Sequence, residues 1–169
     1  MGHQIQPQMI EIRRARESDF DAIWEIFHLV VVKGDTYPYA PETTKEEAHS
    51  IWMIPSVETY IALLDGKIVA TYVLKPNQAG PGSHVANAGF MVHPKYQGSG
   101  IGTVMAEHAL KTAKESGYLA MQFNFVVSTN QTAVSLWKRL GFKIVGTLPK
   151  VFRHQKLGLI DAYVMHRFL

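Results

Sequence analysis

Three glycines at alternate positions, Gly98, Gly100 and Gly102, form the stretch of this sequence whose spacing points most directly to chemistry. They follow the apolar run 90–92 and precede apolar or half-apolar residues with the spacing of one helix face: Ile101, Val104, Met105, His108 and Thr112. The first amides of a helix lack intrahelical partners, and the helix dipole favours an anion there. Because glycine lets the main chain approach that anion without a Cβ clash, the loop predicts a pyrophosphate cradle.

Two common phosphate-binding patterns do not fit this loop. A dinucleotide-binding α/β protein would carry G-x-G-x-x-G, but Thr103 stands where the third glycine is needed. A P-loop would carry a lysine directly after the glycines, and none is present. A glycine-rich turn that serves packing alone is the remaining structural alternative.

The composition bounds the class of protein. The chain has 169 residues, of which 47% are hydrophobic and 18% charged, which is typical of one ordered globular domain. A net charge of +3 without a long lysine or arginine run gives no reason to expect a nucleic-acid partner. The absence of cysteine excludes disulfides and thiolate catalysis. The histidines show no ligand spacing, so no metal site is expected.

The sequence also predicts location and domain organisation. No apolar run approaches the roughly 20 residues of a membrane-spanning helix, so no membrane partner is expected. Residues 1–8 lack the charged and apolar regions of a signal peptide. We therefore expect a cytoplasmic protein with a flexible N-terminal tail, residues 1–9, and a single domain, residues 10–169.

Strands and helices alternate around the glycine loop. Strands are predicted at 10–13, 58–64, 67–75, 84–92, 118–127, 142–146 and 160–165, and the apolar strand 118–127 is expected to be wholly buried. Asp65-Gly66 is a hairpin turn between the second and third of these strands. Helices are predicted after Ser18 as N-cap, after a capping box at Thr44, after the glycine loop, and after residues 129–130. The order β-α-α-β-β-β-α-β-α-β-β is that of one mixed α/β domain.

A second motif lies about thirty residues after the first: Asn130-x-x-Ala133-x-x-Leu136-Trp137-x-x-x-Gly141-Phe142. With Gln97-Gly98-x-Gly100-x-Gly102, it resembles the GCN5-related N-acetyltransferase (GNAT) superfamily over residues 11–169. The resemblance implies a central, mixed but mostly antiparallel sheet flanked by helices. It also implies acetyl-CoA as cosubstrate and direct attack of an amine on its thioester. Dimers are common in this superfamily, so a homodimer is compatible with it.

The resemblance also implies cofactor-binding residues. The main chain of Phe90, Met91 and Val92 would pair with the pantetheine arm, and an amide there would face the thioester oxygen. Asn130, which would also serve as a helix N-cap, matches a cofactor-binding asparagine. The amides of the loop would hold the pyrophosphate: Gln97, Gly98, Ser99, Gly100, Ile101, Gly102 and Thr103.

Two features depart from the family pattern. Trp137 stands where many members have a tyrosine that protonates the leaving thiolate, and an indole is no useful acid near neutral pH. It is interpreted as a wall for the cofactor arm or as a core residue. The strand before the glycine loop lacks the usual carboxylate but carries Asn87, and the next strand carries Asn124. Since asparagine is depleted in strands, the pair is predicted either to line the amine pocket or to be satisfied core amides.

The arrangement of Asn87, Asn124 and Asn130 resembles the yeast N-acetyltransferases that detoxify proline analogues such as azetidine-2-carboxylate. That resemblance implies catalytic roles for Asn87 and Asn124. Substrate contacts are predicted from two loops: Tyr37 and Tyr39 between the first two helices, and Arg153 and His154 in the last hairpin. A guanidinium could clamp an amino-acid carboxylate, but a solvated basic turn explains the same residues.

The leading hypothesis is therefore an acetyl-CoA-dependent N-acetyltransferase for a small amine, such as an amino acid or a toxic analogue of one. A protein or peptide N-acetyltransferase is a variant of it. The other class is an acyl-CoA-binding module without catalysis, for which Trp137 and the missing carboxylate are the support.

Overall fold

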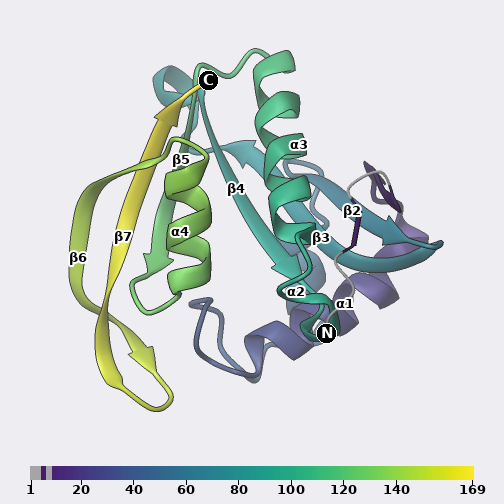
Figure 1. The fold of residues 1–169 in the computed structure, drawn as a ribbon, viewed down its shortest axis with the longest axis horizontal. Coiled ribbons are helices and arrows are strands. Elements are labelled where there is room, and N and C mark those ends of the chain that lie inside the picture. The colour runs from purple at the N-terminus through teal and green to yellow at the C-terminus, as the bar shows by residue number, and fades with distance from the viewer. Residues whose placement is uncertain (1–4, 7–8) are drawn as a thin grey trace.

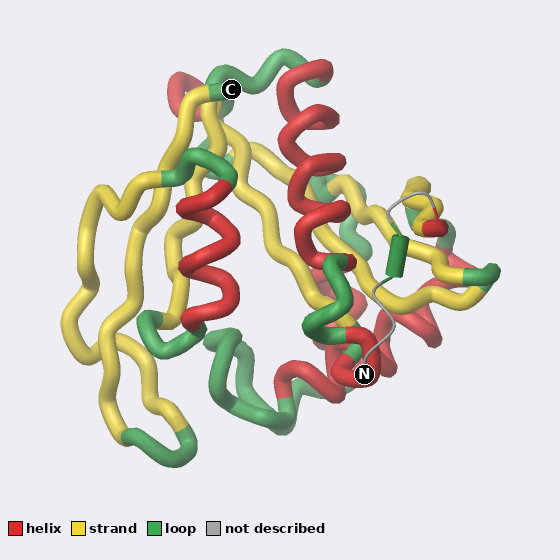
Figure 2. The backbone as a smooth tube through the Cα atoms, viewed as in Figure 1, coloured by secondary structure: helices red, strands yellow, loops and turns green. Residues whose placement is uncertain are grey.

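The computed structural model describes residues 5–6 and 9–169 and contains one seven-stranded sheet. The strand order is β1-β2-β3-β4-β5-β7-β6, and every neighbouring pair is antiparallel except β4 and β5 (Figures 1 and 2). The strands are β1 Ile10–Arg14, β2 Glu58–Leu64, β3 Lys67–Pro76, β4 Val85–Val92, β5 Ala120–Val127, β6 Lys143–His154 and β7 Gly158–Phe168. The helices are α1 Phe20–Val31, α2 Lys45–Trp52, α3 Ile101–Glu115 and α4 Gln131–Arg139. The predicted mixed α/β fold is confirmed.

Helices cover both faces of the sheet. In Figure 1, α3 and α4 lie on the face turned to the viewer, and α1 and α2 lie behind the sheet. Tyr72 and Met105 belong to the core cluster under α3 and α4, whereas Val73 and Trp52 belong to the cluster under α1 and α2. Successive residues of β3 therefore point to opposite cores, as the alternation of a strand requires.

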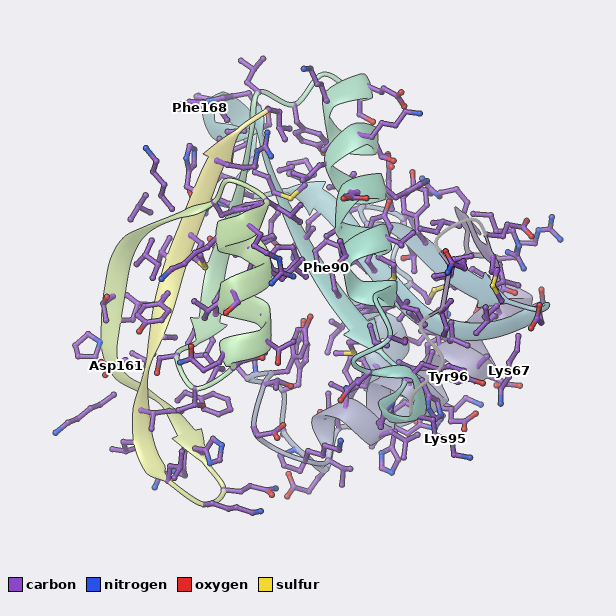
Figure 3. All side chains as sticks on the ribbon, viewed as in Figure 1. Lys67, Phe90, Lys95, Tyr96, Asp161 and Phe168 are labelled. Carbon is purple, nitrogen blue, oxygen red and sulfur yellow. The ribbon has the colours of Figure 1, made fainter. Side chains whose placement is uncertain are left out.

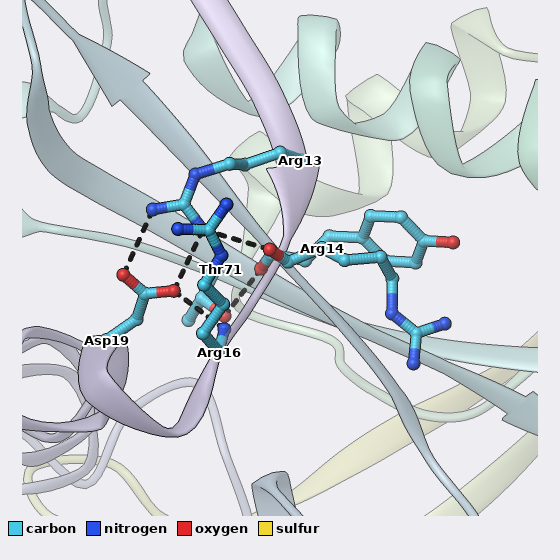
Figure 4. A network of polar contacts seen from close by, with 6 residues as sticks. Arg13, Arg14, Arg16, Asp19 and Thr71 are labelled. Atoms are coloured by element: carbon cyan, nitrogen blue, oxygen red, sulfur yellow. Dashed lines mark hydrogen bonds and ion pairs between the residues drawn. The ribbon is translucent and has the colours of Figure 1, made fainter.

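An ion pair fixes the entry into α1 (Figure 4). The Arg13 guanidinium donates to both carboxylate oxygens of Asp19, at 2.9 and 3.0 Å, and the Arg16 amide donates to the same carboxylate at 2.7 Å. The hydrogen bonds from Arg13 hold the pKa of Asp19 below its usual range. The prediction that Ser18 caps this helix is wrong: Ser18 is exposed, and Asp19 receives the main-chain hydrogen bond.

The predicted turn at Asp65-Gly66 and the predicted capping box at Thr44 are confirmed. Asp65 and Gly66 both have positive φ, 50° and 76°, between β2 and β3. Thr44 and Glu47 exchange the two hydrogen bonds of a capping box at 3.2 and 3.1 Å. The last hairpin is longer than predicted, because β6 and β7 stay paired up to His154 and Gly158.

Two further expectations concern the ends and surroundings of the fold. Most of the predicted tail, residues 1–4 and 7–8, lies outside the described residues, while Ile5 packs against the core under α3 and α4. Within residues 5–6 and 9–169, no helix has the length and apolar character to cross a membrane. The same residues contain no cluster of metal-ligating side chains.

Candidate active site

The sheet splits between β4 and β5. These two strands are paired only at Val85 with Ala120 and at Ala86 with Met121, although β4 continues to Val92 and β5 to Val127. A cleft of about 860 Å³ opens where they separate. It is lined from β3, β4 and β5, from the start of α3, from α4, and from the loop before α2. Because it lies between two strands of one sheet, the cleft takes lining residues from both faces, such as Trp52 on one and Trp137 on the other.

The glycine loop lies at the lip of this cleft and starts α3. Gly98 and Gly100 have φ of 77° and 90°, and Gly100 is the N-cap residue of α3. A Cβ built at either glycine would meet no atom within 4 Å, so open space faces the loop. A 15-residue helix that starts at open space presents free amides and the positive end of its dipole to a ligand. This arrangement fits a pyrophosphate.

The predicted loop residues share this site with one exception. The Gln97 side-chain amide donates to the Val92 carbonyl at 3.3 Å, which ties the loop to the end of β4. The Ser99 hydroxyl donates to the Tyr96 carbonyl and does not line the cleft. The other predicted loop residues line it: Gln97, Gly98, Gly100, Ile101, Gly102 and Thr103.

The β4 edge presents alternate main-chain groups to the cleft. The His93 amide donates to the Val69 carbonyl at 2.9 Å, so His93 and, by alternation, Met91 direct their main-chain groups to β3. Phe90 and Val92 direct theirs to the cleft. The Tyr37 hydroxyl is hydrogen-bonded to both main-chain groups of Phe90: it accepts from the amide at 2.7 Å and donates to the carbonyl at 2.6 Å. Sequence reasoning missed this contact between positions 53 residues apart.

Aromatic side chains form the wall of the cleft under α4. The Trp137 ring lies 5.1 Å from Phe90 and 4.4 Å from Phe123, and only 7% of Trp137 is exposed. Figure 3 shows Phe90 between α3 and α4. Asn130 caps α4 by accepting the Ala133 amide at 3.3 Å, and it also lines the cleft.

Asn87 and Asn124 line the cleft but are not buried core amides. Asn87 is half-buried, and its Nδ2 donates to the Gln122 carbonyl at 3.0 Å, which bridges β4 and β5 where they separate. Asn124 is exposed, so the prediction of a wholly buried strand is wrong here. It donates to Asn77 at 2.7 Å and accepts from the Gln122 amide at 3.0 Å.

The two predicted substrate loops are placed differently. Tyr37 and Tyr39 stack at 5.7 Å and line the cleft, and burial raises the pKa of both phenols. Arg153 and His154 do not line it: Arg153 is exposed on β6, and His154 accepts main-chain amides of the hairpin turn at 3.0 and 3.2 Å.

The charged residues of the cleft are ones that sequence reasoning missed. Lys75 and Arg139 line it, and among the described residues its lining contains neither a carboxylate nor a histidine. Lys75 is the next-to-last residue of an apolar strand and Arg139 the last residue of a helix, so neither position carried a local signal of function.

Comparisons with known proteins agree with this geometry. Residues 17–142 match the model of the acetyltransferase (GNAT) family. The chain is 31% identical to the N-acetyltransferase aca1 of Schizosaccharomyces pombe over 78% of this chain and 71% of that protein. It is 24% identical to the L-amino acid N-acetyltransferase AaaT of Escherichia coli, over 94% and 97%. A solved GCN5-related N-acetyltransferase from Kribbella flavida superposes with a TM-score of 0.93 at 41% identity, covering 97% of this chain and all of that one.

Proposed function

The chain belongs to the acetyltransferase (GNAT) family, and from that membership we propose that it transfers acetyl from acetyl-CoA to the amine of an amino acid or a toxic amino-acid analogue. The observation that carries the proposal is the split between β4 and β5 with the glycine-capped start of α3 at its lip. Similarity to the L-amino acid N-acetyltransferase AaaT supports the acceptor class.

The face with α3 and α4 is the side proposed for the cofactor. The open space at Gly98 and Gly100 fits a pyrophosphate. The Val92 amide faces the cleft and can donate to the pantetheine arm, while the Val92 carbonyl already accepts from the Gln97 side chain. When bound, acetyl-CoA supplies the thioester carbonyl that the amine attacks. The adjacent rings of Trp137 and Phe90 would shield the arm from water.

The Phe90 amide is the proposed donor to the thioester oxygen. A main-chain donor is fixed before the reaction and costs no reorganisation when charge develops on the oxygen. In this structure the Tyr37 hydroxyl holds that amide, so the phenol has to turn away when an acyl oxygen takes its place.

The opposite face, with α1 and α2, is the side proposed for the amine. Asn87, Asn124 and the two stacked phenols offer hydrogen bonds there without a titrating group near neutral pH, because burial raises the pKa of Tyr37 and Tyr39. We infer that no side chain of the cleft takes the proton from the ammonium form. The acceptor would lose its ammonium proton to solvent and attack as the free amine, oriented by the asparagine amides. The proton that the nitrogen releases as the amide forms would then end on the departing CoA thiolate, directly or through water.

A panel of acceptors tests the function. CoA release from acetyl-CoA is measured with amino acids, proline analogues including azetidine-2-carboxylate, polyamines and short peptides. Turnover of amino acids or their analogues is expected. Turnover of peptides alone would assign the acceptor to protein N-termini, and CoA binding without turnover would favour a binding module.

The pH profile tests the absence of an enzyme base. For two acceptors whose amines differ in pKa, the inflection of log kcat/KM should move with the acceptor pKa. An inflection that stays at one pH for both acceptors would reveal a titrating side chain.

A further inference from the structure

Lys75 brings a positive charge to the acceptor side of the cleft. It is the first exposed residue after the buried part of β3, and it lines the cleft. Its register partner across β3 and β4 is Asn87, so the two side chains share a face of the sheet. Val73, two residues earlier, packs in the core under α1 and α2, which places Lys75 on that face.

Arg139 is the other cation of the cleft and lies on the opposite side. It ends α4, which covers the other face of the sheet, and it lines the cleft together with Ser135 and Leu136 of the same helix. The two cations are therefore separated by the sheet. Arg139 is positioned for the cofactor, and Lys75 for the acceptor.

The Lys75 ammonium has no counter-charge within the described structure. Lys45 pairs with Asp21 and Lys111 with Glu115, whereas the Lys75 side chain, like those of most described lysines, makes no ion pair or hydrogen bond to a described residue. What distinguishes Lys75 from the other unpaired lysines is its place in the lining of the cleft. Its cleft neighbours Asn87 and Asn124 are neutral, and no described carboxylate lines the cleft. An uncompensated ammonium in a partly enclosed site favours an anionic ligand group.

The position also suits the size of a free amino acid. Asn87, opposite Lys75, is three residues before Phe90, which at strand spacing is about 10 Å. A flexible four-carbon lysine stem can cover much of that length. The acceptor amine at Phe90 would thus leave its own carboxylate within reach of the ammonium.

We propose that Lys75 binds the carboxylate of the acceptor and makes the enzyme select free amino acids over their amides. This inference rests on the proposed acceptor class. It assigns carboxylate recognition to β3 and not to Arg153, which lies outside the cleft.

The test compares each substrate with itself across variants, because an amino acid and its amide differ in amine pKa. The substrates are azetidine-2-carboxylate and its carboxamide, and the variants are Lys75→Met, Lys75→Arg and Arg139→Met. Lys75→Met should lower kcat/KM for the acid about tenfold or more, mainly through KM, because a charge-assisted hydrogen bond is lost. The carboxamide should change less than about twofold with this variant, and Lys75→Arg should retain most of the acid activity.

Arg139→Met is the matched control, since it removes one positive charge from the other side of the same cleft. It should raise the KM for acetyl-CoA and leave the ratio of acid to carboxamide turnover unchanged. Equal losses for acid and carboxamide in Lys75→Met, or no loss for either, would overturn the assignment of Lys75. If the wild type acetylates neither these two compounds nor any other amino acid, the proposed acceptor class fails together with it.

Discussion

At the scale of single residues, ligand binding in the cleft depends on main-chain amides and carbonyls. Some of these groups are left free, and others are hydrogen-bonded by a side chain. Gly100 leaves the amides at the start of α3 accessible, whereas the Tyr37 hydroxyl is hydrogen-bonded to both the amide and the carbonyl of Phe90. Gly100 is exposed, and Tyr37→Phe keeps the ring that packs against the core under α1 and α2, so each change tests a separate contribution to ligand binding.

Gly100→Ala should weaken acetyl-CoA binding more than tenfold, because a Cβ would enter the open space proposed for the pyrophosphate. Isothermal titration measures the Kd. Gly66→Ala is the control: Gly66 also has positive φ and open space around its Cβ position, but it lies in a hairpin turn away from the cleft. Both variants should lose similar stability from backbone strain. Equal Kd values for the two would contradict the cradle assignment.

Tyr37→Phe should tighten the binding of acetyl-CoA, because it frees the Phe90 amide for the acyl oxygen while keeping the ring that stacks on Tyr39. One hydrogen bond corresponds to roughly a two- to tenfold change in Kd. Binding of CoA, which has no acyl oxygen, should stay the same. Weaker binding of both ligands would mean that the hydroxyl holds β4 in its binding geometry.

At the scale of elements, the split of β4 from β5 and the entry into α1 are each fixed by a few polar contacts. The Asn87 amide bridges the two strands at the point of separation. The Arg13–Asp19 pair joins β1 to the first turn before α1, on the far side of the sheet from α3.

Asn87→Ala should lower kcat more than tenfold and change the Kd for acetyl-CoA less than about twofold, since Asn87 lies on the acceptor side of the split. Stopped-flow acetyl transfer and titration separate the two quantities. Gln122→Ala separates the two asparagines, because it keeps the main-chain carbonyl that Asn87 bonds and removes only the Gln122 side-chain hydrogen bond to Asn124. A normal kcat in Asn87→Ala would mean that Asn87 only links β4 to β5 and takes no part in acetyl transfer.

Asp19→Asn should lower the free energy of unfolding at neutral pH by about 1 kcal/mol, because the carboxylate of a partly buried, doubly hydrogen-bonded pair is lost. The pKa of Asp19 is lowered in the folded state below the ordinary value of an aspartate, mainly by the hydrogen bonds from Arg13. Its contribution is therefore complete above that value and disappears as pH falls through the folded pKa.

Urea denaturation from pH 7 down to pH 3 tests this dependence. The difference between wild type and Asp19→Asn should be constant near neutral pH and shrink below about pH 4. Asp21→Asn, at an exposed carboxylate paired with Lys45, should change stability by less than about 0.5 kcal/mol.

At the scale of the whole molecule, acetyl-CoA bound in the cleft would contact both halves of the sheet, which separate between β4 and β5. The cleft takes residues from β4, β5, α3 and α4, so a bound cofactor should stabilise the two halves of the sheet together. At one hundred times its Kd, acetyl-CoA should add about 2.7 kcal/mol, or roughly 5–10 °C in Tm for a chain of this size.

Thermal melts with acetyl-CoA and with NAD⁺ measure this effect. NAD⁺ has an adenosine diphosphate but no pantetheine arm, and we expect little shift with it. An equal shift with both ligands would revive the dinucleotide-binding interpretation against which Thr103 argues.

The sequence by itself determined what depends on neighbours along the chain. The turn at Asp65-Gly66, the capping box at Thr44 and the glycine-capped start of α3 follow from the backbone needs of four or five consecutive residues. The element order and the two family motifs then identified the mixed α/β fold and the acetyltransferase family.

Only the tertiary structure decided which residues line the two sides of the cleft. Strand pairing that stops after Ala86, the Tyr37 hydroxyl on Phe90, and Lys75 beside Asn87 all join segments distant in sequence. The same long-range packing left Arg153 outside the cleft and Asn124 exposed. Hydrophobic periodicity records which face a residue turns to the core, but it does not record where two neighbouring strands separate, and that separation creates the site.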